Sequence, residues 1–216
     1  MELKRNILDI KGIKVGQAEN PTAKTGVSVV LAEDGAICGV DVRGAGPGTR
    51  ETDLLNPINT VEKVHAVVLS GGSAFGLEAA SGVMNWLEKR GIGFDVGVTS
   101  VPIVPSAVLF DLEYGDAFVR PDKEMGMQAC ENASDSVLLE GDYGAGCGAT
   151  VGKLRGMAHD GLARCIRPIH TSLDGDTIFC LSTGELEFPE NPVDPVGILA
   201  AKVAEQAIIR AVKAAK

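Results

Sequence analysis

The chain has 216 residues, of which 45% are hydrophobic and 23% charged, so it is long enough to bury the core of one domain. Its formal net charge is −9 and its lysines and arginines form no cluster, which argues against nucleic acid as a partner. No apolar run is long enough to span a membrane, and the N-terminus lacks the apolar core of a signal peptide. We therefore expect a single cytoplasmic domain over residues 1–216, with no membrane partner.

The first third of the chain is typical of β structure. Residues 27–31 and 37–42 are two β-rich runs on either side of Asp34 and Gly35. An Asp-Gly pair between two such runs predicts a β-hairpin. A long glycine- and proline-rich connection follows over residues 44–55.

The middle of the chain predicts a strand, a tight turn and a helix. The apolar run "HAVVLS" at 65–70 predicts a buried strand, and Gly71, Gly72 and Ser73 follow as a turn. Apolar residues then recur at helical spacing from 77 to 87, and Gly91 is placed to end the helix. Residues 92–112 predict strand and loop interrupted by prolines.

The last third begins with a second glycine-rich loop, "GAGCGATVGK", at 144–153. Residues 157–167 predict a helix that ends before Pro168, and residues 170–184 a turn and a strand. Asp194 and Pro195 are placed as the N-cap and first residue of a final amphipathic helix. Strands and helices mix throughout, so the predicted fold class is α/β or α+β.

Three motifs are candidates for a functional site. Gly71, Gly72 and Ser73, between a strand and a helix, would bind an anion or a substrate carbonyl through their N–H groups, or form a packing turn only. Asp174 and Asp176 would share one face of an extended strand and orient a base or nucleophile, or they mark a turn.

Lys153 follows the second glycine-rich loop, where it would supply a cation to a ligand or remain a solvated surface charge. Neither loop has the spacing of a nucleotide-binding motif, so we expect no cofactor. The three histidines have no ligand spacing, and we expect them to be structural.

The five cysteines are widely spaced and contain no CxxC pair, which predicts reduced thiols rather than disulfides or a metal site. Cys147, in its glycine-rich loop, is the thiol best placed for chemistry, although a buried and inert cysteine is the simpler interpretation. The cysteines are Cys38, Cys130, Cys147, Cys165 and Cys180.

Four blocks of the chain, in this order, resemble the DmpA-type peptidase family: "GVDVRGAGPGTRETDLLNP", "VVLSGGSAFGLEAASGVMNWLE", "GAGCGATVGK" and "MAHDGLARCIRPIHTSLDGDTIFCLSTG". That family includes L-aminopeptidase/D-esterases, β-peptidyl aminopeptidases and nylon-oligomer hydrolases. The resemblance implies an αββα sandwich like that of N-terminal-nucleophile hydrolases. It also implies hydrolysis of small peptides, amides or esters by acyl transfer to water, and a homo-oligomer.

The resemblance also implies roles for three residues. Lys153 would stabilise charge near the reacting carbonyl, and Asp174 and Asp176 would orient the nucleophile and its amine. Family members carry a long segment between the two parts of this chain, with core strands, the self-cleavage site and the Ser or Thr nucleophile.

That segment is missing here between Gly156 and Met157. A natural deletion, an altered sequence or a decayed gene copy would each produce this arrangement. The sequence therefore supports an aminopeptidase- or amidase-type hydrolase, with a non-catalytic binding or assembly protein as the alternative. We expect the chain to lack central strands of the sandwich.

Overall fold

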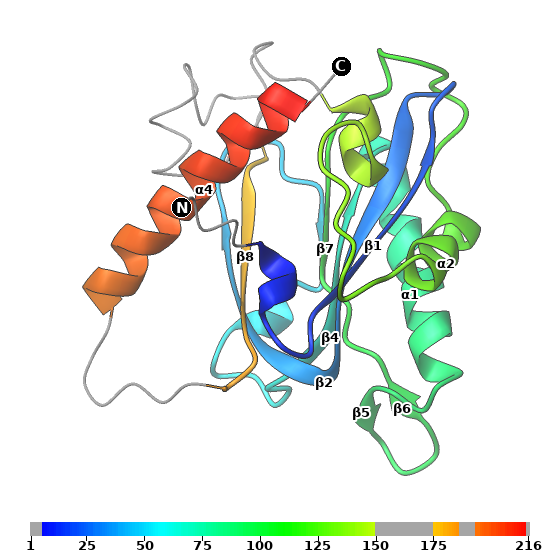
Figure 1. Ribbon diagram of the computed structural model, residues 1–216. Helices are drawn as coiled ribbons and strands as arrows, with labels where there is room; N and C mark the ends of the chain where they lie inside the picture. The colour runs from blue at the N-terminus through cyan, green and yellow to red at the C-terminus, as the bar shows by residue number, and fades with distance from the viewer. Residues whose placement is uncertain (1–5, 150–174, 186–192, 215–216) are drawn as a thin grey trace.

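The computed structural model describes residues 6–149, 175–185 and 193–214. One sheet has the strand order β1-β2-β4-β7-β3, formed by Lys14–Asn20, Thr25–Val42, Val64–Ser70, Ser106–Val108 and Thr49–Arg50. Strands β4 and β7 are parallel, and the other neighbours in this sheet are antiparallel. A short ribbon of β5 (Phe94–Asp95) and β6 (Ser100–Val101) stands apart. This mixed architecture confirms the predicted fold class (Figure 1).

Residues 34 and 35 do not form the expected hairpin, because β2 continues through them as one strand. Its register against β4 shifts between Leu31 and Ala36, and Gly35 has φ +79, which a glycine adopts without strain. The two halves of β2 therefore do not pair with each other. Beyond the bend, Ile37–Val42 pairs with β8, Thr177–Ser182, so that β2 belongs to two β layers (Figure 1).

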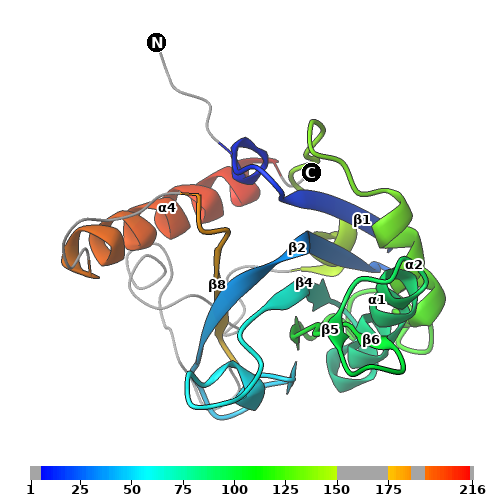
Figure 2. The same cartoon turned by 90° about the horizontal axis from the view of Figure 1, so that it is seen from below.

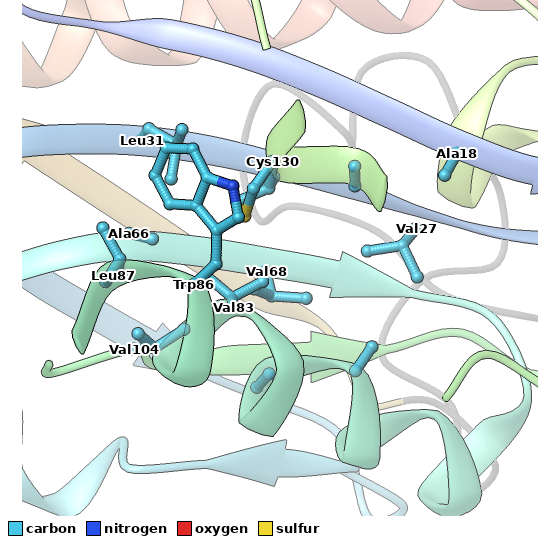
Figure 3. Close-up of a cluster of buried hydrophobic side chains, with 14 residues drawn as sticks. Ala18, Val27, Leu31, Ala66, Val68, Val83, Trp86, Leu87, Val104 and Cys130 are labelled. Carbon is cyan, nitrogen blue, oxygen red and sulfur yellow. The ribbon is translucent and has the colours of Figure 1, made fainter. Parts of the chain in front are cut away.

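Helices α1 (Ala79–Glu88) and α2 (Lys123–Glu131) cover one face of the main sheet. Alternate residues of β4 point to opposite faces, so Val68 packs under α1 whereas Val67 faces the second layer. Burying an aliphatic side chain of this size stabilises the fold by about 1.5–3 kcal/mol. Figure 3 shows this helix-covered cluster around Trp86, whose members include residues of β1, β2, β4, α1 and α2.

The opposite face of the sheet is covered by the second half of β2 and by β8. Cys38 of β2 packs with Val64, Val67 and Ile103, and Phe179 and Leu181 of β8 lie against this cluster. The final helix α4, Val193–Ala214, lies beyond β8 (Figure 2). Over the described residues, the layers therefore follow the order of helices, sheet, second β layer and helix.

The helix predicted after the Gly-Gly-Ser turn is confirmed, preceded by the short 3-10 turn η3, Ser73–Glu78. Gly91 has φ +70 and donates to the Glu88 carbonyl at 2.8 Å, so it ends the helix as predicted. The prediction of Asp194 as the N-cap of the last helix is wrong, because Val193 is already helical and Asp194 lies inside the first turn.

The side chains expected to form the apolar face of α4 are largely exposed, among them Val196, Leu199 and Val203. Its C-terminal end is held by an ion pair between Arg210 and Glu140 at 3.4 Å. None of the helices in the described ranges combines the length and the apolar character that a membrane span requires.

Candidate active site

Three loops meet at the end of the sheet where the parallel strands β4 and β7 finish. The Ser73 N–H donates to the Leu109 carbonyl at 3.0 Å, and the Val108 N–H donates to the Gly48 carbonyl at 3.0 Å. The bend in β2 brings the beginning of β8 to the same end of the molecule (Figure 1). The loop after β2 joins the cluster there, since the Arg43 N–H donates to the Asp176 carbonyl at 2.8 Å.

Asp111 is the buried centre of this loop cluster, with 3% of its surface exposed. One carboxylate oxygen accepts a hydrogen bond from the Thr25 hydroxyl at 2.6 Å, and the other from the Gly72 N–H at 2.7 Å. Burying a carboxylate costs several kcal/mol unless donors surround it, so these two bonds hold the ends of β2 and β4 against the loop after β7.

The sequence analysis did not single out Asp111. Its only signal is an acidic residue directly after the apolar run "IVPSAVLF". The two partners lie 86 and 39 residues away along the chain, so no local pattern pointed to them.

The N–H groups of the Gly-Gly-Ser turn bond to protein acceptors. Gly71 donates to the Gly26 carbonyl at 2.9 Å, Gly72 to Asp111, and Ser73 to the Leu109 carbonyl. A side chain at Gly71 would collide with the Asp111 carboxylate and the Thr25 hydroxyl. These contacts favour the packing-turn interpretation, and substrate binding by Gly71, Gly72 and Ser73 stays a prediction.

The second glycine-rich loop begins as the 3-10 turn η4, Gly144–Gly148, and packs into the same cluster. The Gly144 N–H donates to Glu19 at 2.8 Å. A side chain at Gly148 would meet the Lys24 carbonyl and the Asp111 side chain. The loop therefore lies directly against the buried carboxylate. Lys153, which follows it, lies outside the described residues.

Cys147 is buried in η4, its thiol lies 3.9 Å from the Asn20 carbonyl, and burial raises its pKa. Burial likewise raises the pKa of Cys38 to about 11 and that of Cys130 to about 12. These three thiols are protonated at neutral pH and are poor nucleophiles. Cys147 is therefore buried, as the simpler interpretation expected, and the described cysteines are free thiols.

Asp176 is the one predicted catalytic residue that the described ranges include. It directly precedes β8 and has 4% of its surface exposed. The preceding Gly175 packs against Gly46 and Pro47, where a side chain would collide with backbone. The loop after β2 therefore fixes the position of Asp176. Asp174 lies outside the described residues.

His65 has a structural role, as expected. It is buried in β4, and its Nδ1 accepts a hydrogen bond from the Ile103 N–H at 3.1 Å. Burial, with a smaller contribution from Lys63, lowers its pKa. Over the ranges that the structure describes, no group of three His, Cys, Asp or Glu side chains is placed to hold a metal ion.

The sequence profile of Peptidase family S58 matches residues 5–157 and 153–216. An aminopeptidase of Mycobacterium bovis, itself named uncharacterized, is 35% identical over 314 residues, covering 97% of this chain and 89% of the relative. The chain belongs to peptidase family S58. This confirms the resemblance to DmpA-type peptidases, and with it membership of a family of aminopeptidase-type hydrolases.

Two further comparisons agree. A 6-aminohexanoate-oligomer endohydrolase of a Kocuria species is 34% identical over 146 residues, covering 68% of this chain and 39% of that protein. The solved L-aminopeptidase D-Ala-esterase/amidase of Ochrobactrum anthropi superposes with a TM-score of 0.75 at 16% identity, over 97% of this chain and 86% of that one. Its structure is described as a variant of the Ntn hydrolase fold, which confirms the predicted architecture.

The matches also locate a discontinuity. The family S58 profile matches in two pieces that meet at residues 153–157. The alignment with the mycobacterial relative runs over 314 residues, more than the 216 of this chain. The relative therefore carries residues with no counterpart here. The break in the profile falls where the sequence analysis placed the missing segment, between Gly156 and Met157.

Proposed function

We propose that the chain is an aminopeptidase- or amidase-type hydrolase that acts on short peptides, small amides or small esters by acyl transfer to water. The observation that carries this proposal is the family S58 match on both sides of the discontinuity, together with the loop cluster that positions Asp176. No metal or cofactor enters the proposed reaction.

Within this proposal, Lys153 stabilises the negative charge that develops on the carbonyl oxygen during attack. Asp174 and Asp176 orient the attacking group and accept its proton. Asp176 suits such a role because it is buried and anchored through its own carbonyl and through Gly175, so its carboxylate needs little reorganisation.

The Ser or Thr nucleophile implied by the family resemblance belongs to the segment that has no counterpart here. Water is then the attacking group. Serine proteases that lose their catalytic residues retain about 10³–10⁴-fold acceleration over water from binding and carbonyl stabilisation. We therefore propose slow turnover of this order.

The test is release of p-nitroaniline from a panel of aminoacyl p-nitroanilides, with hydrolysis of short β-peptides followed by mass spectrometry. The same protein unfolded in urea is the control. We expect slow release by the folded chain only. Equal release by the folded and unfolded samples would reject catalysis by this site.

The discontinuity itself favours a second candidate, a non-catalytic family member that retains the binding loops and assembly surfaces. The intact mass of the protein expressed from its native gene bears on this choice. A single species near 22.4 kDa without turnover would support the non-catalytic candidate. Two fragments of larger total mass would show a self-processing hydrolase with the segment present.

We further propose a small peptide or amide as the substrate, a cytoplasmic location and a homo-oligomer. The exposed apolar residues of α4 support the last point, since a second copy would bury them.

A further inference from the structure

A cavity of about 300 Å³ lies on the helix-covered side of the molecule, between α1 and β6. It is separate from the loop cluster around Asp111 and Asp176, with which it shares no lining residue. Its polar wall comes from β3, the outer face of α1 and β6, and its apolar wall from Met84, Val101 and Pro102. The polar lining residues are Arg50, Ser81, Asn85, Glu88 and Ser100.

The cation in this cavity is Arg50, at the end of the short strand β3. Arg50 is half-buried, and its guanidinium donates to the Ser81 hydroxyl at 2.7 Å, to the Met84 sulfur at 3.0 Å and to the Leu77 carbonyl at 3.5 Å. None of these three partners carries a charge, and within the described ranges no carboxylate lies within ion-pair distance of Arg50. A half-buried guanidinium with neutral partners retains donors for a carboxylate.

Two neighbours of Arg50 carry unusual features. Glu51 has φ +59, a left-handed conformation that is strained for a non-glycine residue. Ser106 pairs with Arg50 across the sheet, and its hydroxyl is fully buried with no hydrogen-bond partner in the described structure. Neither residue lines the cavity, and both adjoin Arg50, one in the chain and one across the sheet.

The anion in the cavity is Glu88, whose carboxylate accepts a hydrogen bond from the Thr99 hydroxyl at 3.0 Å. Glu88 lies four residues after Met84 on the same face of α1, and therefore about 6 Å further along the helix axis. The Arg50 guanidinium contacts Met84 and also Ser81, which lies seven residues before Glu88, so the cavity carries a positive charge at one end and a negative charge about 6–10 Å further along the helix.

We propose that this cavity binds a short zwitterionic peptide, with its carboxylate on Arg50 and its ammonium group on Glu88. An extended dipeptide spans about 7 Å, and a hydrogen bond of about 2.9 Å at each end would let it bridge the two charged groups, while the apolar wall would contact its side chains. A cavity of 300 Å³ is also large enough for such a ligand. The proposal concerns binding alone and does not depend on the proposed hydrolysis.

The test is titration of the full chain with the dipeptide Ala-Ala, followed by NMR of ¹³C-methyl-labelled methionine. The Met84 signal is assigned from its loss in Met84→Leu. We expect Ala-Ala to shift the Met84 signal while that of Met125, which lies elsewhere on the helix-covered side, remains in place. N-acetyl-Ala-Ala lacks the ammonium group, and Ala-Ala-amide lacks the carboxylate. Each should bind at least about tenfold more weakly than Ala-Ala.

Variants distinguish the contribution of Arg50 to binding from that of Glu88. Arg50→Gln should weaken Ala-Ala binding by about tenfold or more, whereas Arg50→Lys should retain part of it. Glu88→Gln should weaken Ala-Ala binding but leave N-acetyl-Ala-Ala binding unchanged. Glu78→Gln, a carboxylate change elsewhere on the same side, is the control and should bind normally.

Trp86 fluorescence confirms that each variant is folded. If Arg50→Gln fails to fold, the exposed Glu88→Gln and the two blocked peptides still decide the question. The proposal is overturned if folded wild-type protein shows no Met84 shift at millimolar Ala-Ala. It is also overturned if the blocked peptides bind as well as Ala-Ala.

Discussion

Replacement of Asp111 by alanine tests whether this buried carboxylate holds the loop cluster together. The change removes the acceptor of two hydrogen bonds, from the Thr25 hydroxyl at 2.6 Å and from the Gly72 N–H at 2.7 Å. Both donors are then left in a buried environment, because Thr25 is 2% exposed and Gly72 is buried. The ends of β2 and β4 lose their common link to the loop after β7.

The expected cost follows from these two bonds. A hydrogen bond to a charged group is worth about 1.5–3 kcal/mol, and the desolvation cost of the lost carboxylate offsets part of the sum. We therefore expect Asp111→Ala to lower the free energy of unfolding by about 3 kcal/mol. Asp111→Asn keeps an oxygen for Gly72 but loses the charge, so about 1–2 kcal/mol is expected.

Urea unfolding followed by the fluorescence of Trp86, the single tryptophan, measures both changes. Asp116→Asn is the control, since that exposed carboxylate accepts only a backbone bond from Phe118 at 2.9 Å, and a change within about 0.5 kcal/mol is expected. If Asp111→Ala unfolds within about 0.5 kcal/mol of the wild type, Asp111 does not hold the loops together.

The remaining predictions concern pH and catalysis. Because folding lowers the pKa of His65, the unfolded chain binds more protons below pH 6.5, and the free energy of unfolding should fall as the pH drops from 7 to 5. His65→Asn should flatten this slope, and an unchanged slope would assign it to other groups. Because burial raises the pKa of Cys130 from 9.0 to about 12, stability should fall as the pH rises above 9, and less steeply in Cys130→Ala. Equal slopes in both proteins would contradict the buried thiol. Lys153→Ala should lower turnover more than it lowers stability, and unchanged turnover would reject the proposed role of Lys153.

The sequence predicted those elements whose signals are local. The strand at 65–70 and the helix that ends at Gly91 were both found, because apolar spacing and a C-terminal glycine lie within one segment. The family resemblance then supplied the architecture, which no local pattern contains.

The prediction of a hairpin at Asp34 and Gly35 was wrong because an Asp-Gly pair is equally compatible with a bulge inside a long strand. The choice of pairing partner decides between a hairpin and a bulged strand. Here β4 and β8 pair with the two halves of β2, and both follow it at a distance in the chain.

Asp111 was missed for a related reason, since its role exists only after the chain has brought Thr25 and Gly72 beside it. The same folding changed the interpretation of the Gly-Gly-Ser turn. A glycine turn between a strand and a helix is typical of anion sites, but here protein acceptors take up its N–H groups. Only the folded structure shows which donors remain open.

The most direct test of the proposed hydrolysis is p-nitroaniline release by the wild-type chain and by Asp176→Ala, with Asp135→Asn as an exposed-carboxylate control. Trp86 fluorescence first confirms that all three are folded. We predict release at least about 10³-fold above the buffer rate for the wild type and the control, and a rate at least about 10²-fold lower for Asp176→Ala, which loses the proton acceptor but keeps the carbonyl stabilisation. Release that is equal in Asp176→Ala and the wild type, or absent from the folded wild type, would contradict a hydrolytic site at Asp176.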